Sequence, residues 1–173
     1  LRAQGVPVGN SMVEETAVQA AREILRDADV EDVKVVLPSD HVCAERPAAG
    51  LPTKVVTGSV PAGLMGLDIG PATVEEFAAI LAGAGTVLWN GPLGVFETPP
   101  FDRGTEVVAH ALAELGRRGA YTVLGGGETV AAAGRAGVTN AIGHVSTGGG
   151  ASLELLAGKT LPGLAVLERP AGG

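Results

Sequence analysis

The sequence contains little of several residue types on which particular classes of protein depend. Its one cysteine, Cys43, leaves no partner for an internal disulfide, and no group of cysteines and histidines has the spacing of a zinc site. No apolar run approaches the roughly 18 residues that a membrane-spanning helix needs, and no signal peptide is recognisable. These absences argue against a disulfide-stabilised secreted domain, a zinc protein and a membrane protein, and they predict a cytoplasmic location.

Basic residues are scarce as well. Only 12 residues are lysine or arginine, against 19 aspartates and glutamates, and the formal net charge is −7. Because proteins bind nucleic acids largely through lysine and arginine contacts to phosphates, this balance excludes a basic nucleic-acid surface. An anionic ligand would have to be held mainly by backbone N–H groups, helix N-termini and a metal ion.

Aliphatic residues and glycine are abundant instead. Hydrophobic residues make up 46% of the chain and aromatic residues only 3%, so the core must be built from Val, Leu, Ile and Ala. Such cores are typical of parallel α/β sheets. The length of 173 residues is that of one domain, and we expect residues 1–173 to form a single domain. Some of the 27 glycines gather in short clusters, which are common where the backbone approaches a ligand closely.

Short apolar runs alternate with amphipathic stretches, which predicts repeated strand–helix units. The predicted helices are residues 12–28, 73–82, 105–117, 129–136 and 151–157. The predicted strands are 33–37, 54–57, 86–89, 121–124 and 141–145, and the rest of 38–72 is predicted to be irregular. Ser11 with Glu14, and Thr73 with Glu76, have the spacing of capping boxes. Ligands of open parallel sheets bind beyond the carboxyl ends of strands, where the glycine-rich turns are expected.

The glycines at 125–127 follow one of these predicted strands. Their amides and the positive end of the next helix can bind an anion. Glu128 can coordinate Mg²⁺, whose other ligands would be phosphate oxygens. The alternative is a tight turn in which Glu128 is a solvated residue of the first helical turn.

A second glycine run, at 148–150, follows Ser146 and Thr147. It is either an anion-binding nest at a helix start or a flexible joint. Neither run is a Walker loop or a G-x-G-x-x-G fingerprint.

Two further stretches have both a functional and an ordinary interpretation. Asn90 can donate a hydrogen bond to a phosphate oxygen, or it is an ordinary turn residue. Glu97 can accept hydrogen bonds from two ribose hydroxyls, or it is an ordinary surface charge. Residues 65–71 can wall a flat apolar pocket in which Gly66 admits a ring face, or they are an ordinary loop with a buried Met and Leu. The histidines His41, His110 and His144 are too scattered to bind a metal together, and we expect structural roles for them.

In order and spacing, these stretches resemble phosphoglycerate kinases. The resemblance covers residues 8–15, 37–40, 61–71, 89–97, 125–129 and 144–163, and its most specific parts are 89–92 and 146–152. It implies the C-terminal, nucleotide-binding domain, with a Rossmann-like three-layer α/β/α fold and an open, mainly parallel sheet. It also implies a monomeric, two-domain kinase of glycolysis that uses Mg²⁺ and transfers a phosphoryl group from 1,3-bisphosphoglycerate to ADP, giving 3-phosphoglycerate and ATP.

The resemblance further implies that an N-terminal domain, which binds the phosphoglycerate, and the first strand of this domain precede Leu1. We therefore expect the isolated segment to be inactive. The alternatives are a non-catalytic nucleotide-binding remnant and a glycine-rich scaffold without a ligand.

Site residues are implied by the same resemblance. The nucleotide-binding residues are Met65, Gly66, Leu67, Asn90, Pro92, Gly94, Val95, Glu97, Gly126, Gly127, Glu128 and Thr129. The catalytic residues are Gly127, Thr147, Gly148 and Gly149, and the metal ligand is Glu128. Three positions depart from the family pattern. Glu128 stands where the family usually has Asp, Pro47 where a pocket-wall aromatic is expected, and Gly85 where a Lys often precedes the strand.

Overall fold

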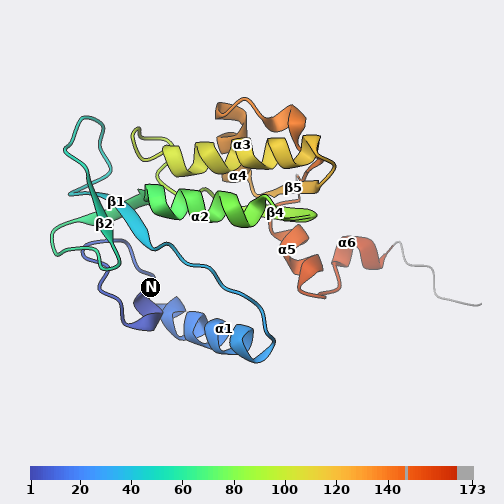
Figure 1. The fold of residues 1–173 in the computed structure, drawn as a ribbon. Helices are drawn as coiled ribbons and strands as arrows, with labels where there is room; N and C mark the ends of the chain where they lie inside the picture. Colours follow the sequence, from blue (N-terminus) through green and yellow to red (C-terminus); the bar gives the residue numbers. More distant parts are fainter. Residues whose placement is uncertain (147, 167–173) are drawn as a thin grey trace, which may run out of the picture. The chain divides into compact units, whose positions relative to one another are not determined.

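The computed structural model describes residues 1–146 and 148–166, so the predicted catalytic residue Thr147 lies outside the described residues. The chain forms two compact units. Unit 1 comprises Leu1–Ile80 and Leu93–Val108, and unit 2 comprises Leu81–Pro92 and Ala109–Gly173. Figure 1 shows the order of the elements along the chain. The single domain expected from the sequence stays a prediction.

An antiparallel sheet organises unit 1. Its strands are β1 (Asp40–Ala44), β2 (Lys54–Thr57) and β3 (Met65–Ile69), in the order β2-β1-β3. The bounds of β2 agree with the strand predicted at 54–57. The prediction that the rest of 38–72 is irregular is wrong for β1 and β3. Both strands lack the alternation of apolar and polar residues that marks a half-buried strand, because β1 is buried at four of its five positions and β3 at its last three.

Two small clusters of apolar side chains form the core of unit 1. Cys43 packs with Val56 and Val60, and Ala44 packs with Leu67 and Phe101. Both clusters use residues of β1, so this strand is the centre of the unit's packing as well as of its sheet.

The carboxylate of Asp40 caps helix α2 (Pro71–Leu81) from the neighbouring strand. It accepts hydrogen bonds from the amides of Ala72 (3.1 Å) and Thr73 (2.8 Å) and from the Thr73 hydroxyl (2.6 Å). The capping box predicted for Thr73 and Glu76 is therefore wrong, because the Thr73 side chain is bonded to β1. A Cβ atom on Gly70 would overlap the Asp40 carboxylate, so this approach requires glycine at position 70.

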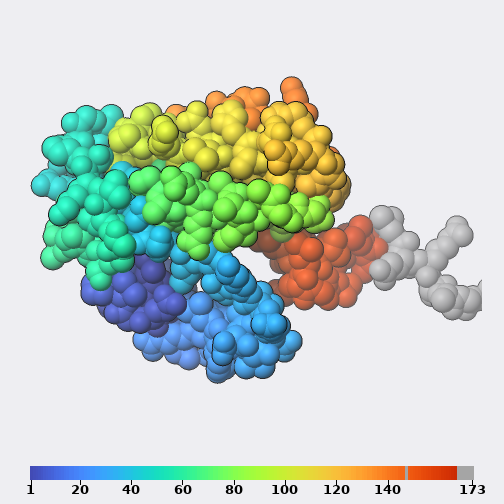
Figure 2. Space-filling view, viewed as in Figure 1, coloured from blue at the N-terminus to red at the C-terminus, as the bar shows by residue number. Residues whose placement is uncertain are grey.

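Helix α1 (Val18–Val30) follows a 3-10 turn, η2 (Glu15–Ala17). The predicted helix at 12–28 exists but starts later, and the predicted Ser11–Glu14 capping box is wrong. The Ser11 hydroxyl accepts a hydrogen bond from the Gly66 amide at 2.9 Å and so joins this segment to β3. Helix α1 has no buried residue, and it lies on the surface in the space-filling view (Figure 2).

Residues 33–37 are not a strand, although the sequence predicts one. Val33 and Val35 are exposed, and no strand in the described part of the chain runs alongside them. Apolar β-branched residues alone do not make a strand, because its N–H and C=O groups need a neighbouring strand to pair with.

Asp68, in β3, is a buried carboxyl group with a raised pKa. It is 4% exposed and accepts hydrogen bonds from the Ile69 and Gly104 amides, each at 2.8 Å. Burial raises its pKa to about 6, although both hydrogen bonds act in the opposite direction.

The folded chain therefore keeps a proton on Asp68 up to about pH 6, whereas the unfolded chain releases it near the ordinary value of 3.8. The folded state binds more protons in this interval, so its stability should fall as the pH rises and then level off above pH 6. We expect the free energy of unfolding, relative to Asp68→Asn, to fall by at most about 3 kcal/mol over this range. Urea unfolding of both proteins at a series of pH values measures the difference, and a flat difference would contradict the raised pKa.

A parallel sheet organises unit 2. Its strands are β4 (Thr86–Asn90), β5 (Tyr121–Gly125) and β6 (His144–Val145), in the order β4-β5-β6. Asn90 pairs with Gly125, and Leu124 pairs with Val145, so the carboxyl ends of these strands lie at one edge. The predicted strand at 141–145 is shortened because the 3-10 turn η3 (Thr139–Ala141) occupies its start. Strand β4 is not buried on both faces, since Leu88 is exposed.

Helices flank the parallel sheet, and the α/β class predicted from the sequence is confirmed. They are α4 (Gly127–Arg135), α5 (Gly150–Leu156) and the part of α3 (Arg103–Arg117) that belongs to unit 2; a short helix, α6 (Pro162–Ala165), follows. Leu112, Leu124 and Ala133 are fully buried. In the described part of the chain, no helix combines the length and apolarity needed to cross a membrane.

Candidate functional site

Asn90 and the first glycine run meet at the carboxyl edge of the parallel sheet. A Cβ atom on Gly125 would lie 3.0 Å from Nδ2 of Asn90, and one on Gly126 would lie 3.4 Å from it. Gly126 also has φ +89°, which favours glycine. Glycine at these positions therefore lets the Asn90 amide lie against the end of β5, close to the start of α4.

Thr129 connects the two loops at this edge. Its hydroxyl accepts a hydrogen bond from the Gly91 amide at 2.6 Å, and its side chain is fully buried. The sequence assigned Thr129 to nucleotide contact, and the structure places its hydroxyl on the turn after β4. Pro92, the next predicted contact, follows this turn and is half-buried.

Gly127 and Glu128 begin helix α4 and are both exposed. The first N–H groups of a helix have no acceptor within the helix, and they carry its positive end. A Cβ atom on Gly127 would meet no atom within 4 Å. The fold therefore does not require glycine there, and a side chain at this position would stand beside the first amides of the helix.

Glu128 offers one carboxylate at this helix start. No group of three or more His, Cys, Asp or Glu side chains gathers into a metal site within the described ranges. A Mg²⁺ ion at Glu128 would therefore take its remaining ligands from phosphate oxygens and water, which is how Mg²⁺ is commonly bound in proteins.

The second glycine run is tied to the end of the sheet. The Ser146 amide donates to the carbonyl of Leu124 at 2.8 Å, and the Ser146 hydroxyl accepts from the Gly148 amide at 3.2 Å. Gly149 has φ +49°, which favours glycine. Gly148 and Gly149 thus lie just before α5, and the anion-nest interpretation of this run stays a prediction.

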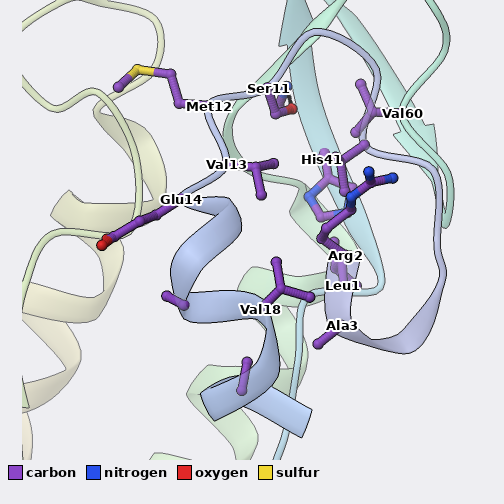
Figure 3. A pocket seen from close by; sticks show the side chains of 14 residues that line it. Leu1, Arg2, Ala3, Ser11, Met12, Val13, Glu14, Val18, His41 and Val60 are labelled. Carbon is purple, nitrogen blue, oxygen red and sulfur yellow. Dashed lines mark hydrogen bonds between the residues drawn. The ribbon is translucent and has the colours of Figure 1, made fainter.

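In unit 1, the predicted residues 65–67 do not all lie on one face of β3. Leu67 is 5% exposed and packs in the core with Phe101, and Met65 packs against the same cluster. Gly66 faces the other side, where a Cβ atom would lie 3.5 Å from Val60 and 3.7 Å from the Ser11 hydroxyl. Gly66 alone of the three lines a cavity of about 420 Å³, which is shown in Figure 3.

The predicted residues Gly94, Val95 and Glu97 follow one another close to β3. The Val95 amide donates to the Leu67 carbonyl at 2.9 Å. A Cβ atom on Gly94 would collide with the Asp68 carboxylate, so packing explains this glycine without a ligand. Glu97 is exposed and free to face solvent.

Sequence reasoning missed the roles of Asp40, Asp68 and His41. The two carboxylates bind amides that are far away in the sequence, and no local pattern indicates such a contact. His41 was expected to be structural, but it lines the cavity beside Gly66. The segment 37–40 directly before it was noted only for its resemblance.

A parallel sheet whose carboxyl edge carries glycine turns and a helix start defines the class of α/β proteins that bind ligands at this edge. Comparison with known proteins shows which family within this class the chain belongs to. The family model described as "Phosphoglycerate kinase" matches residues 1–159. The chain belongs to the phosphoglycerate kinase family.

Curated relatives agree with this assignment. A phosphoglycerate kinase from Thermus thermophilus is 55% identical over 169 residues, which are 97% of this chain and 43% of the relative. The chloroplastic phosphoglycerate kinase 2 of Arabidopsis thaliana is 49% identical over 168 residues, which are 96% of this chain and 35% of the relative. The chain thus spans less than half the length of these relatives.

Solved structures show the same similarity. Phosphoglycerate kinase from Coxiella burnetii superposes with a TM-score of 0.89 at 37% identity, covering 96% of this chain and 43% of that one. The enzyme from Pyrococcus horikoshii OT3 gives a TM-score of 0.74 at 30% identity, covering 96% and 41%.

Proposed function

We propose that this chain is the nucleotide-binding part of a phosphoglycerate kinase. The reaction would be transfer of a phosphoryl group from 1,3-bisphosphoglycerate to ADP, giving 3-phosphoglycerate and ATP. The observation that carries the proposal is the pairing of Asn90 with Gly125 at the carboxyl edge of the sheet, directly before the start of α4. Membership of the family supports the reaction, and this edge supplies the phosphate-binding chemistry.

The residues of unit 2 bind the phosphates in this proposal. The Asn90 side chain and the amides of Gly126 and Gly127 donate hydrogen bonds to phosphate oxygens. Such donors suit this acidic chain, because backbone amides and a helix N-terminus attract anions without a lysine or arginine. The hydroxyl of Thr129 holds the Gly91 turn in place and leaves the direct contacts to its neighbours.

Glu128 would hold the Mg²⁺ ion that accompanies the nucleotide. When bound, the ion neutralises phosphate charge and orients the phosphate oxygens. The glutamate is one methylene longer than the family's usual aspartate. Because it is exposed at the first turn of α4, its side chain has room to adjust to the octahedral geometry that Mg²⁺ demands.

The residues predicted to contact the nucleoside belong to unit 1. Gly66 offers a flat apolar wall, Gly94 and Val95 lie along the adenosine, and Glu97 accepts hydrogen bonds from the ribose hydroxyls. Leu67 and Met65 support this wall from the opposite face of β3, where they pack in the core.

The transfer is an in-line displacement without a covalent enzyme intermediate. An oxygen of the terminal phosphate of ADP forms a bond to phosphorus while the bond from phosphorus to the acyl oxygen breaks. The amides of Gly127, Gly148 and Gly149 stabilise charge on the moving group, which is the usual enzymatic contribution to phosphoryl transfer. In this proposal, 1,3-bisphosphoglycerate and 3-phosphoglycerate bind to the part of the relatives that this chain does not match. A monomeric state and a cytoplasmic location stay predictions.

Mg-ADP titration of the wild-type chain and two glycine variants tests the proposal. Gly127→Ala should keep the fold, because its Cβ meets no atom within 4 Å, but the methyl group would stand where a phosphate approaches. We expect its affinity to fall about tenfold, which corresponds to about 1.4 kcal/mol. The matched control Gly134→Ala, at an exposed position later in α4, should leave affinity unchanged and stabilise the helix by about 1 kcal/mol.

Calorimetry measures the affinities, and thermal unfolding checks the folds. Equal affinity of the two variants for Mg-ADP would show that the start of α4 does not bind phosphate. If titration of the wild-type chain with Mg-ADP gave no heat of binding, the proposed function would be wrong.

A further inference from the structure

The segment 93–104 of unit 1 carries the turn on which Glu97 stands. The Thr98 amide donates to the Val95 carbonyl at 2.9 Å, which closes a four-residue turn around the exposed Glu97. The Val95 amide in turn donates to the carbonyl of Leu67 in β3 at 2.9 Å. The position of the Glu97 carboxylate therefore depends on how this segment is attached to the rest of the unit.

A buried carboxylate holds the end of the segment. The Gly104 amide donates to Oδ2 of Asp68 at 2.8 Å, and Oδ1 accepts from the Ile69 amide at 2.8 Å. Cβ atoms on Gly94 and Gly104 would both collide with the Asp68 side chain, so this carboxylate fills the space between the two ends of the segment. A carboxylate offers an acceptor oxygen to each of the two amides, whereas an asparagine side chain offers an oxygen to only one.

A buried hydroxyl holds the start of the segment. The Leu93 amide donates to the hydroxyl of Thr105, in the first turn of α3, at 3.0 Å, and Thr105 is 2% exposed. Between the two ends, Phe101 is fully buried in the cluster with Ala44 and Leu67. The segment is thus fixed at its start, in its middle and at its end, and the Glu97 turn projects from it.

A segment that is fixed before a ligand arrives binds it better than a loose one. A loose segment has to be ordered when the ligand binds, and the free energy of this ordering is subtracted from the affinity. The cost is greatest for a contact in which one carboxylate meets two hydroxyls at once, because both hydrogen bonds need the same orientation. Asp68 and Thr105 supply this orientation from outside the predicted set of nucleotide contacts.

We propose that Asp68 and Thr105 are positioning residues for ribose recognition, which hold the segment 93–104 so that Glu97 accepts hydrogen bonds from both hydroxyls of a bound nucleotide. The role of Glu97 in this inference rests on the proposed function. The attachment of the segment comes from the hydrogen bonds of Asp68 and Thr105 themselves.

Mg-ADP and its 2′,3′-dideoxy analogue, which lacks both ribose hydroxyls, test the inference by calorimetry well above pH 6, where Asp68 is ionised. We expect the wild-type chain to bind Mg-ADP about tenfold more tightly than the analogue. Asp68→Asn and Thr105→Val should each reduce this preference at least about threefold and leave the affinity for the analogue unchanged. Thr105→Ser keeps the hydroxyl and should retain the wild-type preference.

The preference between the two nucleotides separates positioning from a purely structural role. A variant that only loses folded protein would bind both nucleotides less well by the same factor. Thermal unfolding checks that each variant is folded, and if Asp68→Asn does not fold, the comparison of Thr105→Val with Thr105→Ser decides the inference. The control Asp29→Asn, at an exposed position of α1, should bind both nucleotides like the wild type.

A double-mutant cycle shows whether Asp68 acts through Glu97. Glu97→Ala should abolish the preference for Mg-ADP, and adding Asp68→Asn should then change neither affinity further. Full preference in both Asp68→Asn and Thr105→Val, or equal losses for the two nucleotides, would overturn the inference. So would a further loss when Asp68→Asn is added to Glu97→Ala.

The same titrations keep this inference distinct from the proposed function. If the wild-type chain prefers Mg-ADP and all the Asp68 and Thr105 variants keep this preference, the proposed function stands and the positioning role is wrong. If the wild-type chain binds both nucleotides equally, phosphate binding stands, while ribose recognition and the positioning role are wrong. If it binds neither, the proposed function and the inference are both wrong.

Discussion

Asp40→Ala is expected to destabilise unit 1 by about 3 kcal/mol or more. The change removes the acceptor of two helix amides and of the Thr73 hydroxyl in one step. Asp40 is 3% exposed, so water cannot easily replace the carboxylate. Each buried donor that loses its partner costs about 1–3 kcal/mol, and the start of α2 also loses a negative charge that stabilises its dipole.

Urea unfolding followed by circular dichroism measures this effect. The control Asp27→Ala removes an aspartate from the exposed face of α1, where it pairs with Arg26. Such surface changes usually stay within about 0.5 kcal/mol. A similar midpoint for the Asp27 and Asp40 variants would show that the cap contributes little to stability.

The carboxylate of Asp40 also leads to a prediction for the stability of the chain in acid. Burial would raise the pKa of Asp40, but the hydrogen bonds from Thr73 and Ala72 outweigh it and lower the pKa below 3.8. The contribution of Asp40 is therefore complete above the ordinary pKa of an aspartate and is lost as the pH falls through the folded-state pKa. The stability gap between the wild-type chain and Asp40→Asn should narrow in acid.

Glu128→Gln is expected to reduce the benefit of Mg²⁺ for nucleotide binding. The carboxylate is a strong Mg²⁺ ligand and the amide a weak one, so affinity for Mg-ADP should fall about tenfold, which corresponds to about 1.4 kcal/mol. Without the metal, the negative charge of Glu128 repels the phosphates of ADP. Removing this charge should leave metal-free binding unchanged or make it tighter.

Calorimetry with ADP, once with Mg²⁺ and once with a chelator, distinguishes the two effects. Glu154→Gln in α5 is the matched control, because it removes an exposed carboxylate elsewhere in unit 2 and should change neither affinity. Equal losses for Glu128→Gln in both solutions would mean that Glu128 does not bind the metal. Glu128→Asp, which restores the family's usual residue, should bind Mg-ADP at least as well as the wild type.

The local sequence pattern was sufficient to predict those helices and strands whose formation depends mainly on residues close to them in the sequence. The strand β2 and the helices α2, α3, α4 and α5 begin and end within a few residues of their predicted bounds, because their apolar spacing or flanking glycines indicate them. The carboxyl ends of β4, β5 and β6, after which Gly91 and the two glycine runs follow in the sequence, also lie at one sheet edge, as expected for parallel strands.

Contacts between distant residues could not be predicted in this way. Asp40 caps a helix whose amides lie 32 and 33 residues away in the sequence. Ser11 is bonded to Gly66 across 55 residues, although its spacing to Glu14 is that of a local cap. Within β3, no local pattern shows that Leu67 lies in the core while Gly66 lines a cavity, because the facing of this strand depends on what packs against it.

The in-register pairing of β4 with β5 has a consequence for how this sequence can change. The two strands pair residue by residue from Thr86 opposite Tyr121 to Asn90 opposite Gly125. Inserting or deleting a single residue within β4 would turn the side chain of Asn90 to the reverse face of the sheet. The two paired strands therefore tolerate substitutions but not changes of length.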